Sequence, residues 1–107
     1  MKTAASLRVE AVLVDDAVCF SFSDLCQASL CTPAQMRALV EEGILQPLVC
    51  GPDPAGWVFH GMSLPVARTA QRLLHGLQLD VAAVALVLDL MAENQDLRAR
   101  LRRAGLA

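Results

Sequence analysis

Hydrophobic and polar residues alternate at the start of the chain and follow helical spacing over most of the remainder. From Leu7 to Val14, apolar side chains at every second position predict a short β-strand. The pair Asp15-Asp16 supplies turn residues before a second extended segment, Val18 to Phe22. The sequence therefore predicts an N-terminal β-hairpin.

Two short helices are predicted directly after the hairpin. Ser23 is expected to cap the first of them, with Asp24 to Ala28 as its body and an acid in its first turn. Thr32-Pro33-Ala34-Gln35 has the sequence of a capping box with proline at the first helical position. Because Gly43 suits a left-handed helix end, the second helix is predicted over Pro33 to Glu42. Two short helices so close together are typical of a helix-turn-helix.

A small β-wing and two longer helices are predicted in the second half of the chain. Gln46 to Cys50 and Trp57 to His60 are expected to pair as the two strands of the wing. Apolar positions then recur at helical spacing from Ser63 to about Gly76. Asp80 is expected to cap a last helix that runs from Val81 to about Ala104.

The last helix carries a heptad pattern, which predicts a dimer interface. Valine at an a position, leucine at d positions and one asparagine at a favour two parallel strands, although antiparallel pairing stays open. The residues expected to form the interface are Val87, Leu90, Asn94, Leu97 and Leu101. The alternative is that these side chains simply pack on the core of their own chain.

The composition indicates one soluble, folded domain. The chain has 107 residues, of which 55% are hydrophobic and 19% charged, and this excludes disorder. We expect a single domain over residues 1–107, with the helix-turn-helix and wing up to about residue 62 and a helical part over about 63–105. The longest apolar run, Val81 to Leu88, is far shorter than the roughly 20 residues that cross a bilayer. With no secretory signal pattern at the start, a cytoplasmic protein is expected.

The sequence offers little for catalysis or for metal binding. The cysteines are Cys19, Cys26, Cys31 and Cys50. Their spacing does not match the close pairs of structural zinc sites, so we expect reduced, mostly buried thiols, no metal and no cofactor. His60 and His75 are far apart in the sequence, and no nucleophile lies in a recognisable motif. The protein is therefore not expected to be an enzyme.

The distribution of charge disfavours DNA as a partner. Residues 1–60 contain three basic side chains, those of Lys2, Arg8 and Arg37. Seven acidic residues lie in the same stretch, namely Glu10, Asp15, Asp16, Asp24, Glu41, Glu42 and Asp53. A surface that binds the phosphate backbone needs cations on the docking face, and the helix-turn-helix lacks them.

The order of elements resembles the winged helix-turn-helix of MerR-type regulators, with Arg37 and Gly43 at positions where those proteins carry the same residues. From about Phe20 to Leu101, the chain resembles more closely the CbpM family of chaperone modulators, which are small MerR-like proteins. The similar segments are Phe22-Ser23-Asp24-Leu25-Cys26, Glu42-Gly43-Ile44-Leu45-Gln46-Pro47, Trp57-Val58-Phe59, and Arg72-Leu73-Leu74-His75-Gly76-Leu77-Gln78-Leu79-Asp80 followed by Ala85-Leu86-Val87-Leu88-Asp89-Leu90-Met91. The resemblance implies a mainly α fold with a small β-wing, a MerR-like winged helix-turn-helix with a C-terminal dimerising helix.

The resemblance also implies a protein partner. CbpM proteins bind the J-domain of the DnaJ-like co-chaperone CbpA and keep it from stimulating DnaK, and J-domains present a basic helix to DnaK. An inhibitor of that contact should offer acids around an apolar anchor. The residues expected to contact the partner are Trp57 and Leu48, with Asp24, Glu41 and Glu42 as a charged rim.

Two alternatives stay open at this point. Trp57 could instead belong to the core of the wing, with Glu41 and Glu42 as ordinary solvated acids. The alternative function is a MerR-type transcription regulator that binds DNA through Arg37.

Overall fold

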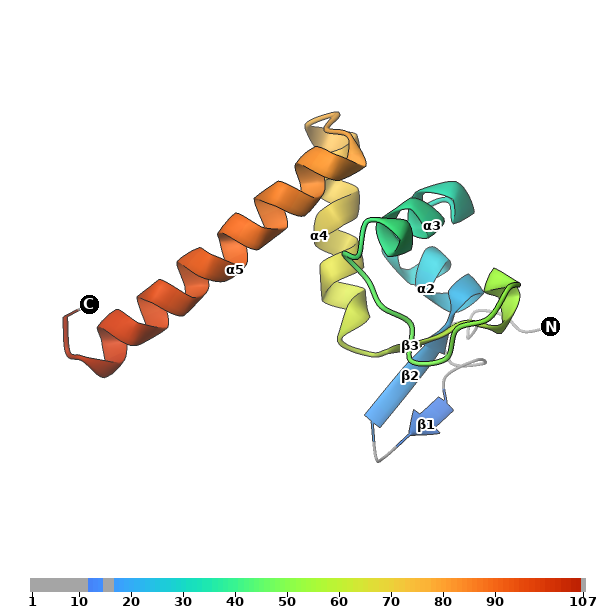
Figure 1. Cartoon of the computed structure of the whole chain (residues 1–107), viewed down its shortest axis with the longest axis horizontal. Coiled ribbons are helices and arrows are strands. Elements are labelled where there is room, and N and C mark those ends of the chain that lie inside the picture. Colours follow the sequence, from blue (N-terminus) through green and yellow to red (C-terminus); the bar gives the residue numbers. More distant parts are fainter. Residues whose placement is uncertain (1–11, 15–16, 107) are drawn as a thin grey trace.

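A three-stranded antiparallel sheet forms one side of the protein. The computed structural model describes residues 12–14 and 17–106, with strands β1 (Val12–Val14), β2 (Ala17–Ser21) and β3 (Val58–His60) in the order β1-β2-β3 (Figure 1). The predicted hairpin is confirmed, because Val14 pairs with Ala17 and Val12 with Cys19. Residues 7–11 of the predicted first strand and the Asp15-Asp16 turn lie outside the described residues.

The predicted pairing of the wing is confirmed only in part. Val49 forms an antiparallel bridge with Val58, and Val58 N–H donates to Val49 O at 3.1 Å. The segment Gln46–Cys50 does not extend this bridge into a strand, and β3 pairs along its length with β2 instead, Phe59 opposite Phe20. Pro47 has no N–H to donate to a ladder, and pairing with β2 leaves Phe59 fully buried. The remainder of the wing is a loop with a 3-10 turn η1 (Pro54–Gly56), which contacts α2.

The first helix of the helix-turn-helix, α2 (Phe22–Ser29), begins earlier than predicted. Its N-cap is Ser21, whose Oγ accepts a hydrogen bond from the backbone N–H of Asp24 at 3.1 Å, so the predicted Ser23 cap is wrong. The earlier start makes Phe22 part of the helix. Phe22 and Cys26 then lie one turn apart and both enter the core.

The second helix, α3 (Pro33–Glu41), matches its prediction to within one residue. Gln35 N–H donates to Thr32 Oγ1 and Thr32 N–H donates to Gln35 Oε1, both at 3.0 Å, which completes the predicted capping box. Gly43 has φ +79°, the left-handed conformation expected after the helix.

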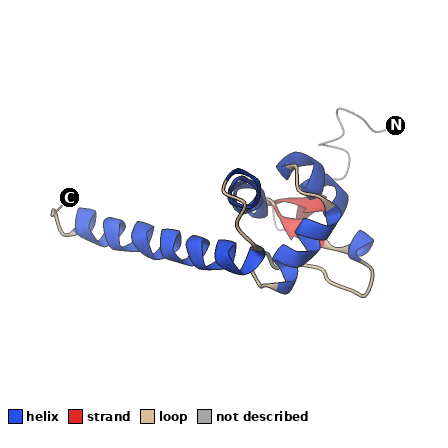
Figure 2. Ribbon diagram, turned by 90° about the horizontal axis from the view of Figure 1, so that it is seen from above, coloured by secondary structure: helices blue, strands red, loops and turns tan. Residues whose placement is uncertain are grey.

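Two further helices complete the fold. Helix α4 (Ser63–Gly76) packs on α2, and the last helix, α5 (Val81–Arg103), starts at the predicted cap, where Asp80 Oδ1 accepts a hydrogen bond from Ala83 N–H at 2.8 Å. Figures 1 and 2 show that α5 then leaves the rest of the molecule and projects away from it. Below, residues 17–88 are called the body and residues 90–103, the outer part of α5, are called the arm.

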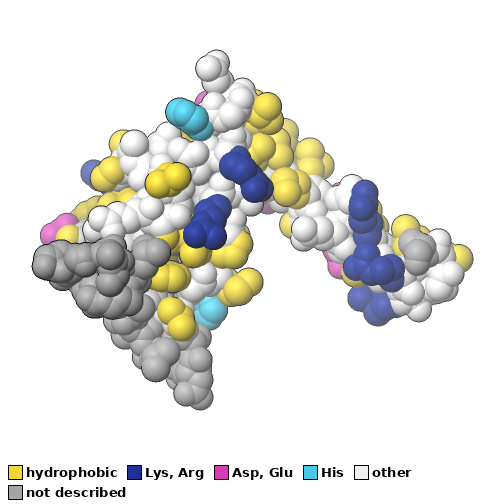
Figure 3. Space-filling model, turned by 180° about the vertical axis from the view of Figure 1, so that it is seen from behind, with side chains coloured by type: hydrophobic (Ala, Val, Ile, Leu, Met, Phe, Trp, Pro, Cys, Tyr) yellow, Lys and Arg dark blue, Asp and Glu magenta, His cyan; other side chains and the backbone are white. Residues whose placement is uncertain are grey.

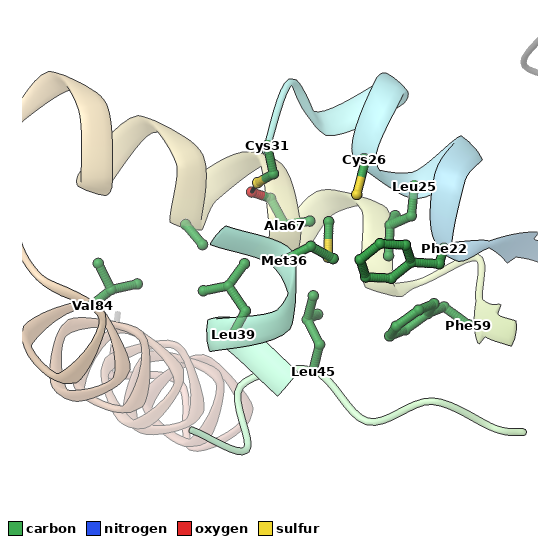
Figure 4. Close-up of a cluster of buried hydrophobic side chains, with 11 residues drawn as sticks. Phe22, Leu25, Cys26, Cys31, Met36, Leu39, Leu45, Phe59, Ala67 and Val84 are labelled. Carbon is green, nitrogen blue, oxygen red and sulfur yellow. Dashed lines mark hydrogen bonds between the residues drawn. The ribbon is translucent and has the colours of Figure 1, made fainter. Parts of the chain in front are cut away.

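The hydrophobic core lies inside the body, between the sheet and the helices (Figure 4). Its buried members are Phe22, Leu25, Cys26, Cys31, Met36, Leu39, Leu45, Phe59, Ala67, Ala70 and Val84. Helix α5 supplies only Val84 to this set, with Val81 and Leu88 packed at its edge. The body thus holds the first two turns of α5, and the arm has no layer of the same chain to pack on.

Candidate protein-binding surface

An exposed apolar stripe runs along α5. Leu86, Leu90, Leu97 and Leu101 have 61%, 57%, 51% and 43% of their surfaces exposed. These residues are spaced by four, seven and four positions, which puts them on one side of a helix. Asn94 is exposed between them, and Val87 is partly buried. The structure therefore leaves four of the five predicted interface residues, Leu90, Asn94, Leu97 and Leu101, available to a partner.

The exposure of the stripe rules out the alternative that these leucines fill the core of their own chain. The exposed stripe of α5 also includes Leu86, which the heptad pattern placed next to the predicted interface and not within it. The spacing of four between Leu86 and Leu90 could have indicated this, because residues four apart share a helix face. The free end of α5 is basic, and Figure 3 shows blue side chains gathered there. The basic residues of this end are Arg98, Arg100, Arg102 and Arg103.

The residues predicted to contact the partner lie in different environments. Glu41 and Glu42 are exposed at the end of α3, and Leu48 is 53% exposed in the loop that follows. Asp24, by contrast, is only 4% exposed. It lies in the first turn of α2, and because it is buried it does not form part of an exposed charged rim.

Trp57 is partly buried and holds the wing loop against the body. Its ring meets Phe22 edge-on at a centroid distance of 5.8 Å and Phe59 at 6.4 Å. Its indole Nε1–H donates to the backbone oxygen of Gly51 at 2.8 Å. These contacts support the interpretation of Trp57 as a residue of the wing's own core, with only part of its ring on the surface.

A shallow hollow of about 230 Å³ lies where the end of α3, the start of α4 and the inner part of α5 meet. Its lining residues are Glu42, Gly43, Ile44, Val66, Ala85, Leu88 and Asp89. Glu42 and Asp89 contribute carboxylates to this lining, and four other lining residues, Ile44, Val66, Ala85 and Leu88, have apolar side chains. Sequence analysis found Glu42 but not Asp89, because nothing local in the sequence relates a residue of α5 to the end of α3.

The cysteines are thiols in the structure. Cys19, Cys26 and Cys31 are buried and Cys50 is exposed. Burial, and after it the neighbouring Cys31, raises the pKa of the Cys26 thiol to about 11. Burial also raises the pKa of Cys31, although a hydrogen bond with Ser29 lowers it in part. Both groups are therefore protonated and unreactive at neutral pH.

The described part of the chain contains neither a metal-binding cluster nor a membrane-spanning helix. Over residues 12–14 and 17–106, no three His, Cys, Asp or Glu side chains converge on a point that could hold a metal ion. Within the same residues, no helix combines the length and the apolar character that crossing a membrane requires.

Comparison with known proteins identifies the family. A model described as MerR HTH family regulatory protein matches residues 20–104. The chaperone modulatory protein CbpM of Pseudomonas putida (strain W619) is 38% identical over 74 residues, which cover 69% of this chain and 71% of that protein. CbpM of Citrobacter koseri is 29% identical over 86 residues, 80% of this chain and 83% of that protein, and CbpM of Salmonella arizonae is 31% identical over 81 residues, 76% and 78%. The chain belongs to the CbpM family.

Membership of the CbpM family confirms the resemblance stated for the sequence. The MerR-type helix-turn-helix is present as α2 and α3, the small sheet stands beside it, and α5 closes the matched region. The relatives are named as chaperone modulatory proteins and the matching model as a regulatory protein, and neither name is that of an enzyme.

The helix that contacts DNA in a helix-turn-helix is weakly charged in this member of the CbpM family. On α3, Arg37 is exposed, and Glu41 is also exposed one turn later. No lysine or arginine occurs between Arg37 and Arg68. The surface around the end of α3 therefore carries carboxylates without cations from the wing.

Proposed function

We propose that this protein is a chaperone modulator that acts in the cytoplasm, binds the J-domain of a DnaJ-like co-chaperone of the CbpA type and inhibits its stimulation of DnaK. The observation that carries the proposal is the similarity to proteins named chaperone modulatory protein CbpM, which extends over 71–83% of the three relatives above. The chain covers most of each relative, so the proposal concerns the whole protein and not a fragment of its activity.

The charge on the body supports a basic partner. Glu41 and Glu42 are exposed at the end of α3, and Leu48 and Val49 expose apolar surface on the loop that follows. Charged residues of opposite sign across an interface mainly raise the association rate, whereas apolar anchors supply most of the affinity. An acidic surface with apolar residues is therefore suited to the basic helix that a J-domain presents.

The proposed working form is a homodimer joined along α5. The stripe of Leu86, Leu90, Leu97 and Leu101 is exposed in the single chain. A helix with one continuous apolar side is stabilised when that side is covered by a second helix. We include Val87 and Asn94 in the interface, Asn94 as the polar residue that fixes register.

The direct test is a calorimetric titration of the protein with the isolated J-domain at several salt concentrations, together with the DnaK ATPase rate stimulated by the co-chaperone. We expect binding that weakens with salt, and inhibition of the stimulated rate. The double variant Glu41→Lys/Glu42→Lys should bind at least about tenfold more weakly, since like charges would then meet.

A matched control is Glu93→Lys/Asp96→Lys, which makes the same change in net charge on the arm. It should keep the affinity of the original protein, provided light scattering shows the same mass. Absence of any J-domain binding by the unaltered protein would overturn the proposed function. If both double variants bind equally weakly, the loss of affinity reflects net charge in general, and Glu41 and Glu42 are not specific contacts.

The second candidate function is a DNA-binding transcription regulator. The observation that favours it is the match to a MerR HTH regulatory family, together with the exposed Arg37 on α3. This function requires duplex binding that weakens steeply with salt and is lost in Arg37→Ala. A fluorescence titration with random duplex DNA at low salt distinguishes the two candidates, because absence of binding there excludes DNA as a partner.

A further inference from the structure

The hollow between α3, α4 and α5 combines apolar side chains with two carboxylates from distant parts of the chain. Ile44, Val66 and Leu88 are among its lining residues, together with the exposed Glu42 and Asp89. Neither carboxylate forms an ion pair with any residue of the described chain. The hollow can therefore take a group that is apolar along its length and positively charged at its end.

We propose that this hollow receives one lysine or arginine side chain from the basic helix of the J-domain partner. The inference rests on the proposed function and adds to it a defined subsite. The methylene stem of such a side chain lies on Ile44, Val66 and Leu88, and its charged end lies between Glu42 and Asp89. Long basic side chains bury their stems on apolar surface in this way while their charged ends stay near water.

The chemistry of the hollow favours a protein cation over a bound metal ion. Calcium takes about six to eight oxygen ligands, and magnesium holds a near-octahedral set of six. The hollow offers the carboxylates of two residues only, and the rest of its lining is glycine, alanine and branched apolar side chains. Two carboxylates are too few to complete such a set, whereas the apolar side chains beside them can pack against a methylene chain.

The arginines of the same α5 do not reach the hollow. Arg98, the first of them, follows Asp89 by about 14 Å along the axis of a rigid helix. The arginine at position 100 is already paired with Asp96 at 3.0 Å. Among residues 12–14 and 17–106, no basic side chain forms an ion pair with Glu42 or Asp89. We assign the cation to another molecule, and the acidic surface of the body favours the basic helix of the partner as its source.

The test uses Asp89, because Asp89 is exposed and its replacement leaves the core intact. We expect Asp89→Lys to weaken J-domain binding roughly tenfold and Asp89→Asn about threefold, with a smaller dependence on salt in both. Glu93→Lys is the matched control, since it reverses one exposed acid on the same helix, one turn further on and outside the hollow. It should bind as the unaltered protein does, and all three variants should unfold at the same temperature as the unaltered protein.

A charge-swap experiment then identifies the partner residue. Each lysine and arginine of the basic helix of the J-domain is changed to glutamate in turn, and each variant is titrated with Asp89→Lys. One of these pairs should recover most of the lost affinity, while the same J-domain variant binds the unaltered protein poorly. A purely structural role for Asp89 would produce no such rescue.

Three outcomes decide the matter. If the unaltered protein does not bind the J-domain, the proposed function fails and the subsite fails with it. If the unaltered protein binds but Asp89→Lys and Glu93→Lys behave alike, the subsite alone is overturned. If Asp89→Lys changes the mass of the protein in light scattering and leaves J-domain affinity unchanged, a second copy of this chain occupies the hollow, and the assignment to the partner is overturned.

Discussion

The body and the arm use similar residues to different ends. In the body, leucine, methionine and phenylalanine from α2, α3 and β3 meet each other and are fully buried. On the arm, leucines at helical spacing lie in water, and an ion pair there, between Arg100 and Asp96, is exposed and worth only about 0.3–0.5 kcal/mol. The difference shows that an apolar pattern predicts that the side chains will be buried, but not by which molecule. Where another layer of the same chain faces the pattern, the chain buries it, and where none does, a partner has to cover it.

The largest effect that separates the two regions is the loss of a core side chain. Phe59 is fully buried, and Phe59→Ala should lower the free energy of unfolding by about 3–5 kcal/mol because it leaves a cavity. Urea unfolding followed by circular dichroism measures this. The matched truncation on the arm, Leu97→Ala, should cost less than about 1 kcal/mol at protein concentrations low enough to keep the chain monomeric. A similar cost at both positions would mean that the arm packs on its own chain.

The next effect concerns the association of the arm. Asn94→Lys/Leu97→Asp places two charges on the apolar stripe, so we expect the mass found by light scattering to fall from that of a dimer to that of a monomer. Ala92→Asp is the control, because Ala92 follows Leu90 by about 200° around the helix and faces away from the stripe. An unaltered protein that is already monomeric at high concentration would contradict the proposed dimer.

The smallest expected effect is a pH dependence of stability that comes from a buried thiol of the body. The Cys26 thiol has a pKa of about 11 in the folded body against 9.0 as its ordinary value, so the unfolded chain loses this proton first. Stability is therefore complete below about pH 9 and should fall by about 1–2 kcal/mol as the pH rises towards 11. Urea unfolding at pH 8 and pH 10.5 measures the change. The chain has no tyrosine, so phenol groups do not contribute to the change.

Two variants assign that pH dependence. Cys26→Ala should flatten it, although the variant is less stable at every pH. Cys50→Ser should keep it, because the Cys50 thiol is exposed. A pH dependence that survives in Cys26→Ala would have to be assigned to Cys31, whose pKa is raised by burial as well.

Features that depend on neighbouring residues could be predicted from the sequence. The capping box at Thr32 and Gln35 and the cap at Asp80 need only three or four consecutive residues, and the structure has both. The α2 cap was misplaced by two residues because Ser21 and Ser23 are equally able to cap. Only the burial of Phe22, a property of the folded body, decides between them.

Features that depend on distant residues could not be predicted in the same way. Strand β3 had two available neighbours, the segment Gln46–Cys50 and β2, and local propensity does not choose between them. The same limit applies to the surface. Asp24 was expected to be exposed and is buried, and Asp89 joins Glu42 in one hollow only when the first turns of α5 pack on α4.

The length of the arm has a consequence for how the protein acts at low concentration. Fourteen residues of helix carry most of the association surface outward over about 20 Å, beyond the hollow at the base of α5. In the proposed dimer, both copies can therefore engage partners at once. A co-chaperone assembly that carries two J-domains would bind at both hollows of the dimer. The second binding step is then intramolecular and depends on the effective concentration, so the avidity could exceed the single-site affinity by about 10²–10⁴-fold.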